Sequence, residues 1–249
     1  MTNQCLELFF REHPRAALGF SGGVDSAFLL HAAREAGADV VPYFVRTQFQ
    51  PAFEMEDAQR LAREVGVALR VIELDALADP HVVRNGPDRC YFCKRRIFAA
   101  IREAARADGY DAVIDGTNAT DDADDRPGMR ALAELGVLSP LRRCGIGKDE
   151  VRALSRRAGL FTADKPSYSC LATRIADGTE LTEEKLRLVE RAEAFLFSRG
   201  FADFRVRLRG GEARIQLPAA QMPQLVAQRE DVLAAFDGFT AVTLDLYAR

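Results

Sequence analysis

Three sets of residues in this chain of 249 have the types and spacing of chemical sites. Residues 21–26 read Ser-Gly-Gly-Val-Asp-Ser and follow a short apolar run. Cys90 and Cys93 stand three positions apart, and Cys170 lies far along the chain. Arg205 and Arg207 alternate with apolar residues near the C-terminus. These residue types point to phosphate binding, thiolate chemistry and anion recognition.

The hexapeptide predicts a phosphate-binding loop between a strand and a helix. Gly22 and Gly23 lack side chains that would block close approach, so main-chain N–H groups at the start of the helix can surround a phosphate. The hydroxyl groups of Ser21 and Ser26 add donors. We expect Asp25, whose carboxylate repels phosphate, to hold a Mg2+ ion that neutralises departing pyrophosphate. No lysine follows the glycines as in a Walker A loop, which argues against a kinase or GTPase. A merely tight glycine turn is the alternative.

The pattern from residue 16 to 114 is typical of a parallel sheet with crossover helices. Apolar runs predict strands at 16–20, 40–45, 69–74 and 112–114, with helices between them. We therefore expect an α/β, doubly wound parallel sheet domain over residues 1–165. Ligands of such sheets bind beyond the carboxyl ends of the strands. The hexapeptide falls there, as do Gly116 and Thr117, so both segments are predicted to line one site.

The pattern changes after residue 165, where a smaller α+β domain is expected over 166–249. Helical periodicity covers 183–198, and strands are predicted at 204–208, 213–217 and 241–246. We expect this domain to serve substrate binding or oligomerisation. In the first domain, the acidic run 121–126 is either a solvated loop or a metal or substrate site.

Composition bounds the class of protein. With 48% hydrophobic and 29% charged residues and no apolar run of roughly 18–20 residues, a membrane protein is not expected. No signal peptide pattern opens the chain, and the odd set of five cysteines fits a reducing compartment, so we expect a cytoplasmic protein. Cys5 and Cys144 are expected to be thiols without chemistry. A net charge of −3 gives no general attraction to nucleic acid.

Chemistry alone leaves several interpretations of the other three cysteines open. A thioredoxin-like pair would need a fold context that is absent here. A structural zinc site would need a fourth ligand, for which no histidine has an obvious claim. An iron–sulfur cluster held by Cys90, Cys93 and Cys170 would leave one iron with an open position for a substrate or an extra sulfide. Inert thiols are the remaining alternative.

The strand, hexapeptide and helix resemble the PP-loop ATP pyrophosphatases, which cleave ATP between the α and β phosphates. Within that superfamily the chain is similar, over nearly its whole length, to the LarE family of sacrificial sulfur transferases. That family makes the nickel-pincer nucleotide cofactor of lactate racemase. The other segments that carry the resemblance are Asp88–Lys94, Asp115–Asn118, Arg126–Gly128, Ser139–Leu141, Lys148–Arg152, Lys165–Ser167, Cys170–Arg174 and Arg205–Arg207.

The resemblance implies an enzyme that adenylates the carboxylates of a pyridinium biscarboxylate mononucleotide and converts them to thiocarboxylates. ATP and Mg2+ are implied cofactors, with ATP at the hexapeptide, Gly116 and Thr117. One form of the family destroys the cysteine that matches Cys170, whereas another keeps three cysteines around a 4Fe-4S cluster whose extra sulfide is donated. We favour the cluster, because a self-consuming enzyme needs neither Cys90 nor Cys93. Trimers or hexamers are also implied.

The arginines are the expected substrate ligands. Arg205 and Arg207 are two apart on a predicted strand, hence on one face, where they could clamp the substrate phosphate bidentately. A solvated cationic edge is the alternative. Arg174 is expected to orient the acyl phosphate, while Glu193 reads as a surface charge on a helix.

Rival functions and departures from the family remain. A PP-loop transfer-RNA thiolase should carry a basic surface or an RNA-binding module, and a glutamine-dependent amide synthetase should carry a glutaminase domain. A non-catalytic iron–sulfur scaffold belongs to a different class. Thr120 is additional relative to the family pattern, and the familiar glycine is missing from the C-terminal residues 245–249. Both departures concern loops rather than the chemistry.

Overall fold

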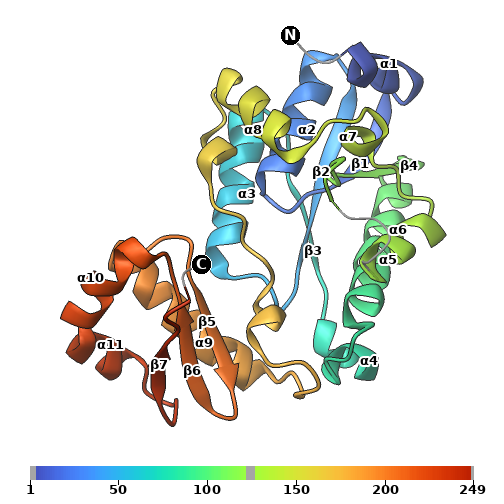
Figure 1. The fold of residues 1–249 in the computed structure, drawn as a ribbon. Helices are drawn as coiled ribbons and strands as arrows, with labels where there is room; N and C mark the ends of the chain where they lie inside the picture. The colour runs from blue at the N-terminus through green and yellow to red at the C-terminus, as the bar shows by residue number, and fades with distance from the viewer. Residues whose placement is uncertain (1–3, 122–126, 248–249) are drawn as a thin grey trace. The chain divides into compact units, whose positions relative to one another are not determined.

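The computed structural model describes residues 4–121 and 127–247 (Figure 1). The chain forms two compact units, of which the first comprises residues 1–76 and 87–165 and the second 77–86 and 166–249. The segment 77–86 therefore groups with the C-terminal unit, a feature that the single predicted division after residue 165 does not include. Most of the acidic run, residues 122–126, lies outside the described residues.

The first unit is built on a parallel sheet with the strand order β3-β2-β1-β4. The predicted α/β class is confirmed, and each strand ends within one residue of its predicted bounds. The chain runs outward from β1 to β2 and β3 and then crosses to β4, so the order reverses between β1 and β4, where doubly wound sheets bind ligands. The strands are β1 (Arg15–Gly19), β2 (Asp39–Arg46), β3 (Arg70–Glu73) and β4 (Ala112–Asp115).

Helices cover both faces of this sheet, as the side chains of β1 show. Ala16 and Leu18 belong to one buried core, whereas Ala17, which points the other way, belongs to a second. The first core contains residues of α1 (Gln4–Glu12), α2 (Val24–Glu35), α3 (Ala52–Val65) and α8 (Lys148–Arg157). The second contains residues of α5 (Arg89–Ala107) and α6 (Pro127–Glu134).

Shorter elements connect these layers. Helix α3 ends at Gly66, whose φ of 75° lies in the left-handed region where glycine carries no steric cost. The connecting elements are η1 (Ala76–Ala78), α4 (Pro80–Val83), α7 (Pro140–Arg143) and η2 (Phe161–Asp164).

The second unit contains a three-stranded sheet in the order β5-β6-β7, with β5 antiparallel and β7 parallel to β6. The apolar face of the β5–β6 pair is buried, and the helix predicted at 183–198 has those bounds in the structure. Two short helices, α10 and α11, precede β7. The elements are η3 (Leu171–Arg174), α9 (Glu183–Ser198), β5 (Arg205–Arg209), β6 (Glu212–Gln216), η4 (Ala219–Gln221), α10 (Met222–Ala227), α11 (Arg229–Ala235) and β7 (Val242–Leu244).

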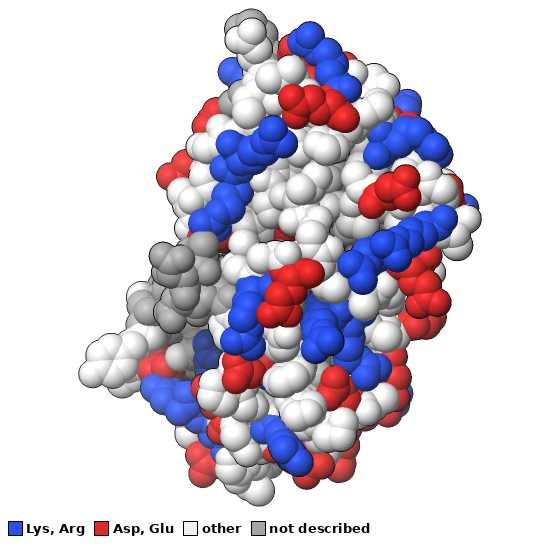
Figure 2. Space-filling view, turned by 90° about the vertical axis from the view of Figure 1, so that its right-hand side faces the viewer, with Lys and Arg blue, Asp and Glu red and all other residues white. Residues whose placement is uncertain are grey.

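Two surface properties bear on possible partners. Among the described residues, no helix combines the length and the apolar character needed to cross a bilayer. Figure 2 shows one face of the molecule, over which lysine and arginine side chains are interspersed with aspartate and glutamate side chains. That face has no single sign of charge.

Candidate functional site

The hexapeptide lies between β1 and α2 as predicted, and its last three residues form the first turn of α2, which begins at Val24. Gly22 has a φ of 70°, in the left-handed region that favours glycine, and a Cβ added there would make a tight contact of 3.3 Å with the main-chain nitrogen of Ala58. The Ser21 and Ser26 hydroxyl oxygens lie 3.2 Å apart, and the Ser26 Oγ donates to the main-chain oxygen of Gly23. These short-range bonds fold the loop back onto the first turn of α2.

Gly116, just after β4, lies against the start of α2. A Cβ added to Gly116 would stand 2.9 Å from the main-chain nitrogen of Ser26, a distance that real Cβ atoms do not show. The backbone after β4 therefore approaches the phosphate loop directly. The structure brings the two predicted ATP-binding segments together at the switch point of the sheet.

Thr117 is buried beside Gly116, and its hydroxyl donates to a carboxylate. The acceptor is Asp115, which is 5% exposed and also accepts from the Ser139 Oγ at 2.6 Å. A buried carboxylate needs such donors, because burying a charge without partners is costly. In this structure the hydroxyl of Thr117 therefore holds the loop after β4 in place.

Asp25 has two partners that the sequence analysis did not include in the site. Its Oδ2 lies 2.5 Å from the Lys148 Nζ, and its Oδ1 accepts from the Asn118 Nδ2 at 3.2 Å. Lys148 begins α8, and its main-chain nitrogen donates to Thr120, which in turn donates to Asn118. An ammonium group thus lies beside the loop, although the loop has no Walker lysine. The signal in the sequence was the segment Lys148–Arg152, one of those that carry the family resemblance.

The three cysteines of the predicted cluster are not in disulfides. Cys90 is exposed in the first turn of α5, and Cys93 is half-buried at the start of the second turn. The Arg89 guanidinium lies 3.7 Å from the Cys90 sulfur. Cys170 precedes η3 in the second unit. Across residues 4–121 and 127–247, no group of three or more His, Cys, Asp and Glu side chains is arranged to hold a metal ion.

The expectation for the remaining two cysteines is wrong. Cys5 of α1 and Cys144, which follows α7, form a disulfide across 139 positions of sequence. Both segments pack in the core over α2, which brings the two sulfurs together. The odd cysteine count therefore reflects one bridge and three thiols.

Glu193 is a buried charge and not the surface charge that its helical position suggested. It is 1% exposed and accepts from the Arg174 Nε at 2.7 Å, from the Tyr168 hydroxyl and from the main-chain nitrogen of Val206. Arg174, also buried, further donates to the Ser169 Oγ at 2.9 Å. This ion pair fixes the chain on both sides of Cys170, because Tyr168, Ser169 and Arg174 all belong to that segment.

The two arginines of β5 differ in burial. Arg205 is 4% exposed and donates to the main-chain oxygens of Phe204 and Ser167. Arg207 is half-buried, and its Nε donates to the Gln216 Oε1 at 2.6 Å while its Nη1 donates to the Thr173 oxygen at 2.9 Å. Both arginines therefore contact the segment that carries Cys170.

Comparison with known proteins identifies relatives over nearly the whole chain. No family model matches. The uncharacterized protein slr1717 of Synechocystis sp. is 39% identical over 246 residues, which cover 97% of this chain and 92% of that protein. The tRNA-specific 2-thiouridylase MnmA of Streptomyces avermitilis is 32% identical, over 66% of this chain and 54% of that enzyme.

A further relative carries a specific name. The pyridinium-3,5-bisthiocarboxylic acid mononucleotide synthase of Lactiplantibacillus plantarum is 35% identical over 236 residues. The match covers 93% of this chain and 86% of that enzyme, so it spans both units. With the phosphate loop at the switch point of a doubly wound sheet, this similarity shows that the chain belongs to the LarE family of PP-loop enzymes.

Proposed function

We propose that this protein uses ATP to convert the carboxylates of a pyridinium dicarboxylate mononucleotide to thiocarboxylates. The observation that carries the proposal is the glycine-lined loop of residues 21–26 against Gly116, in a chain that matches the pyridinium-3,5-bisthiocarboxylic acid mononucleotide synthase over 93% of its length. Such a loop suits a nucleotide's phosphates, since main-chain N–H groups at a helix start attract anions. The relative's printed name supplies the substrate and product classes.

The activation step follows from carboxylate chemistry. A carboxylate is a poor electrophile, so one of its oxygens attacks the α phosphorus of ATP, the bond from that phosphorus to the bridging oxygen breaks, and pyrophosphate leaves. A sulfur nucleophile then attacks the acyl carbon of the acyl-adenylate. The bond between that carbon and the adenylate oxygen breaks, and AMP leaves with the oxygen. The product carries sulfur in place of one carboxylate oxygen.

Asp25 and Lys148 supply charges for the first step. The carboxylate oxygens of Asp25 are the ligands that Mg2+ prefers, and they would hold the ion next to the departing pyrophosphate. Lys148 forms an ion pair with the Asp25 carboxylate. Its ammonium group would move to the phosphates when ATP binds. Charges fixed before reaction stabilise the charge that develops on the leaving group.

Sulfur delivery is proposed to involve Cys90, Cys93 and Cys170, which would hold a 4Fe-4S cluster. Thiolates are the usual ligands of such clusters, and three of them leave one iron open to carry an extra sulfide. All three cysteines are outside the disulfide, which supports this assignment. Loss of the Cys170 sulfur itself is the alternative source.

Iron and sulfide analysis after anaerobic reconstitution tests the sulfur source independently of activity. We expect bound iron and sulfide in the wild type and loss of both in each Cys→Ala variant, with pyrophosphate release retained. The sacrificial route would instead be established by a preparation that binds no iron and makes thiocarboxylate only once per chain. Mass spectrometry would then show that Cys170 has lost hydrogen sulfide.

A transfer-RNA thiolase is the second candidate, favoured by the similarity to MnmA. That match covers only 54% of the thiolase, the net charge of the chain is −3, and the one face drawn in Figure 2 mixes both signs of charge. A small-molecule nucleotide is therefore the substrate that we propose. We further propose a homo-oligomer of three or six chains, and light scattering would measure its mass.

Substrate-dependent pyrophosphate release tests the proposed function directly. ATP would be supplied alone, with the pyridinium dicarboxylate mononucleotide, or with transfer RNA. We expect release above background with the mononucleotide and a sulfur-for-oxygen mass change in the product. Stimulation by transfer RNA and not by the mononucleotide would overturn the proposal in favour of the thiolase.

A further inference from the structure

The polar face of the second sheet gathers arginines from two strands. In the antiparallel register, Arg207 lies directly opposite Arg214, and Thr243 of β7 lies beside Arg214. Directly opposite residues project from the same face of a sheet. The intervening positions of β5 and β6 are buried in the core, so these side chains lie on the opposite, polar face.

Two guanidinium groups opposite one another repel, because like charges at such positions destabilise a strand pair. One carboxylate lies nearby. The Asp245 Oδ2 accepts from the Arg214 Nη2 at 2.8 Å and from the Gln216 Nε2 at 2.8 Å, and Gln216 accepts from Arg207. A continuous chain of bonds thus fixes both guanidinium groups on one face.

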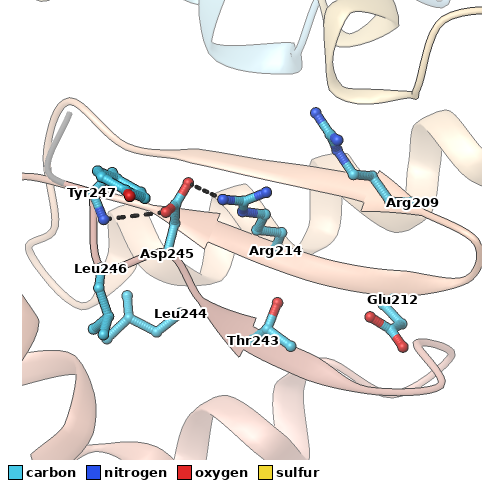
Figure 3. Close-up of a pocket in the computed structure, with 8 residues that line it drawn as sticks. All are labelled: Arg209, Glu212, Arg214, Thr243, Leu244, Asp245, Leu246 and Tyr247. Atoms are coloured by element: carbon cyan, nitrogen blue, oxygen red, sulfur yellow. Dashed lines mark hydrogen bonds and ion pairs between the residues drawn. The ribbon is translucent and has the colours of Figure 1, made fainter.

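Asp245 orients Arg214 without being available to a ligand. Its side chain is 4% exposed, whereas that of Arg214 is 39% exposed. Figure 3 shows the Arg214 guanidinium held at one end by Asp245, with Tyr247 beyond that carboxylate. The exposed N–H groups of Arg214 can therefore donate to an anion while its Nη2 stays bonded to Asp245.

A cavity of about 430 Å3 lies beside Arg214 on this face (Figure 3). That volume falls within the range of about 300–1,000 Å3 that is common for small-molecule sites. Thr243, the exposed Arg209 and the exposed Glu212 also line the cavity, whereas Arg207, opposite Arg214 in the strand register, is not one of its lining residues. By contrast, Arg205 is buried and donates to two main-chain oxygens.

We propose that Arg214 joins Arg207 in binding the phosphate of the mononucleotide substrate, with Asp245 and Gln216 as positioning residues. A dianionic phosphomonoester between two guanidinium groups would offset their repulsion and accept charge-assisted hydrogen bonds from each. The identity of the ligand rests on the proposed function, whereas the anion site itself rests on the geometry of this face.

Binding of two matched ligands to Arg214→Gln tests this inference. The probes are the pyridinium-3,5-dicarboxylate mononucleotide and the nucleoside that lacks its phosphate, each titrated calorimetrically. We expect the variant to bind the mononucleotide about ten- to a hundredfold more weakly and the nucleoside with unchanged affinity, since one charge-assisted contact is lost. Arg229→Gln, an exposed change in the same unit, is the control.

The outcomes separate this inference from the proposed function. Equal affinities of variant and wild type for the mononucleotide, or equal weakening for both ligands, would overturn it, as would a wild type that binds no mononucleotide. Arg214-dependent binding of the mononucleotide without pyrophosphate release would support the site and contradict the proposed function. Arg214→Lys, which keeps the charge and loses the planar fork, should bind with intermediate affinity and guards against a folding defect in Arg214→Gln.

Discussion

The phosphate loop of the first unit and the face of the second unit's sheet that carries Arg207 and Arg214, the arginine face, are both proposed to bind anions, and they are built in different ways. The loop relies on main-chain groups at the end of β1 and the start of α2, and its two serine hydroxyl groups bond within a few residues of one another. The arginine face relies on side chains from β5, β6 and the segment after β7, joined by Gln216 and Asp245. A main-chain site needs the absence of side chains, whereas a side-chain site needs particular partners.

That difference determines which substitutions each region tolerates. At the phosphate loop, a methyl group added to Gly116 after β4 would stand only 2.9 Å from the main-chain nitrogen of Ser26, so backbone would have to shift. In the second unit, removal of one member of a buried pair leaves a charge without a partner. The predictions below test this contrast from the largest expected effect to the smallest.

Glu193→Gln should cause the largest loss of stability. The change leaves the buried Arg174 guanidinium without its counter-charge, and breaking a buried pair in this way costs about 3–5 kcal/mol. The free energy of unfolding from urea denaturation measures it. Glu184→Gln, on an exposed position of the same helix, should change stability by no more than about 0.5 kcal/mol. A similar small loss in both variants would mean that Glu193 does not hold this region together.

Asp25→Asn should act on catalysis and not on folding. Loss of the carboxylate removes the proposed Mg2+ ligand and the partner of Lys148, so substrate-dependent pyrophosphate release should fall about 100- to 1,000-fold. Asp149→Asn, an exposed change in the first turn of α8, is the matched control and should release pyrophosphate at the wild-type rate. Wild-type release by Asp25→Asn would remove Asp25 from the mechanism.

Gly116→Ala should damage the main-chain site through a single methyl group. The added Cβ would stand 2.9 Å from the Ser26 nitrogen, and such overpacking costs about 1–3 kcal/mol of unfolding free energy. ATP binding, measured by calorimetry, should weaken as the loop shifts. Gly86→Ala, where nothing lies within 4 Å of the added atom, should leave both quantities unchanged. If Gly116→Ala binds ATP normally, the close approach of the two segments is not part of the site.

The sequence predicts what depends on local pattern, and this includes the sheet of the first unit and the phosphate loop. Alternating apolar runs specify the strands, and the position of Gly116 after β4 follows from the common edge of parallel strands. It does not predict pairs that only the fold brings together. Lys148 is 123 positions from Asp25, and Cys144 is 139 positions from Cys5. The prediction that Glu193 is a surface charge was wrong for the same reason. Helical periodicity indicates which face of the helix a residue occupies, but it does not show that the buried Arg174 lies opposite that residue.

Asp245 offers the smallest and most specific test of the side-chain network. Hydrogen bonds from Gln216 and Arg214 lower the pKa of Asp245 from its ordinary 3.8 to about 2 in the folded protein. A carboxyl whose pKa is lower when folded adds stability above the unfolded value, and that stability is lost as the pH falls through the folded value. The contribution of Asp245 should therefore be complete above about pH 5 and disappear progressively between about pH 5 and pH 2.

Urea denaturation of the wild type and Asp245→Asn at a series of pH values measures this contribution. Because asparagine does not titrate, the stability difference between the two proteins should be constant above about pH 5 and should shrink as the pH falls toward 2. Asp237→Asn, at an exposed position of the same unit, controls for the loss of one negative charge. A difference that stays constant from pH 5 to pH 2 would show that Asp245 does not hold Arg214 and Gln216 through its charge, so the arginine face would then depend on packing rather than on the ion pair.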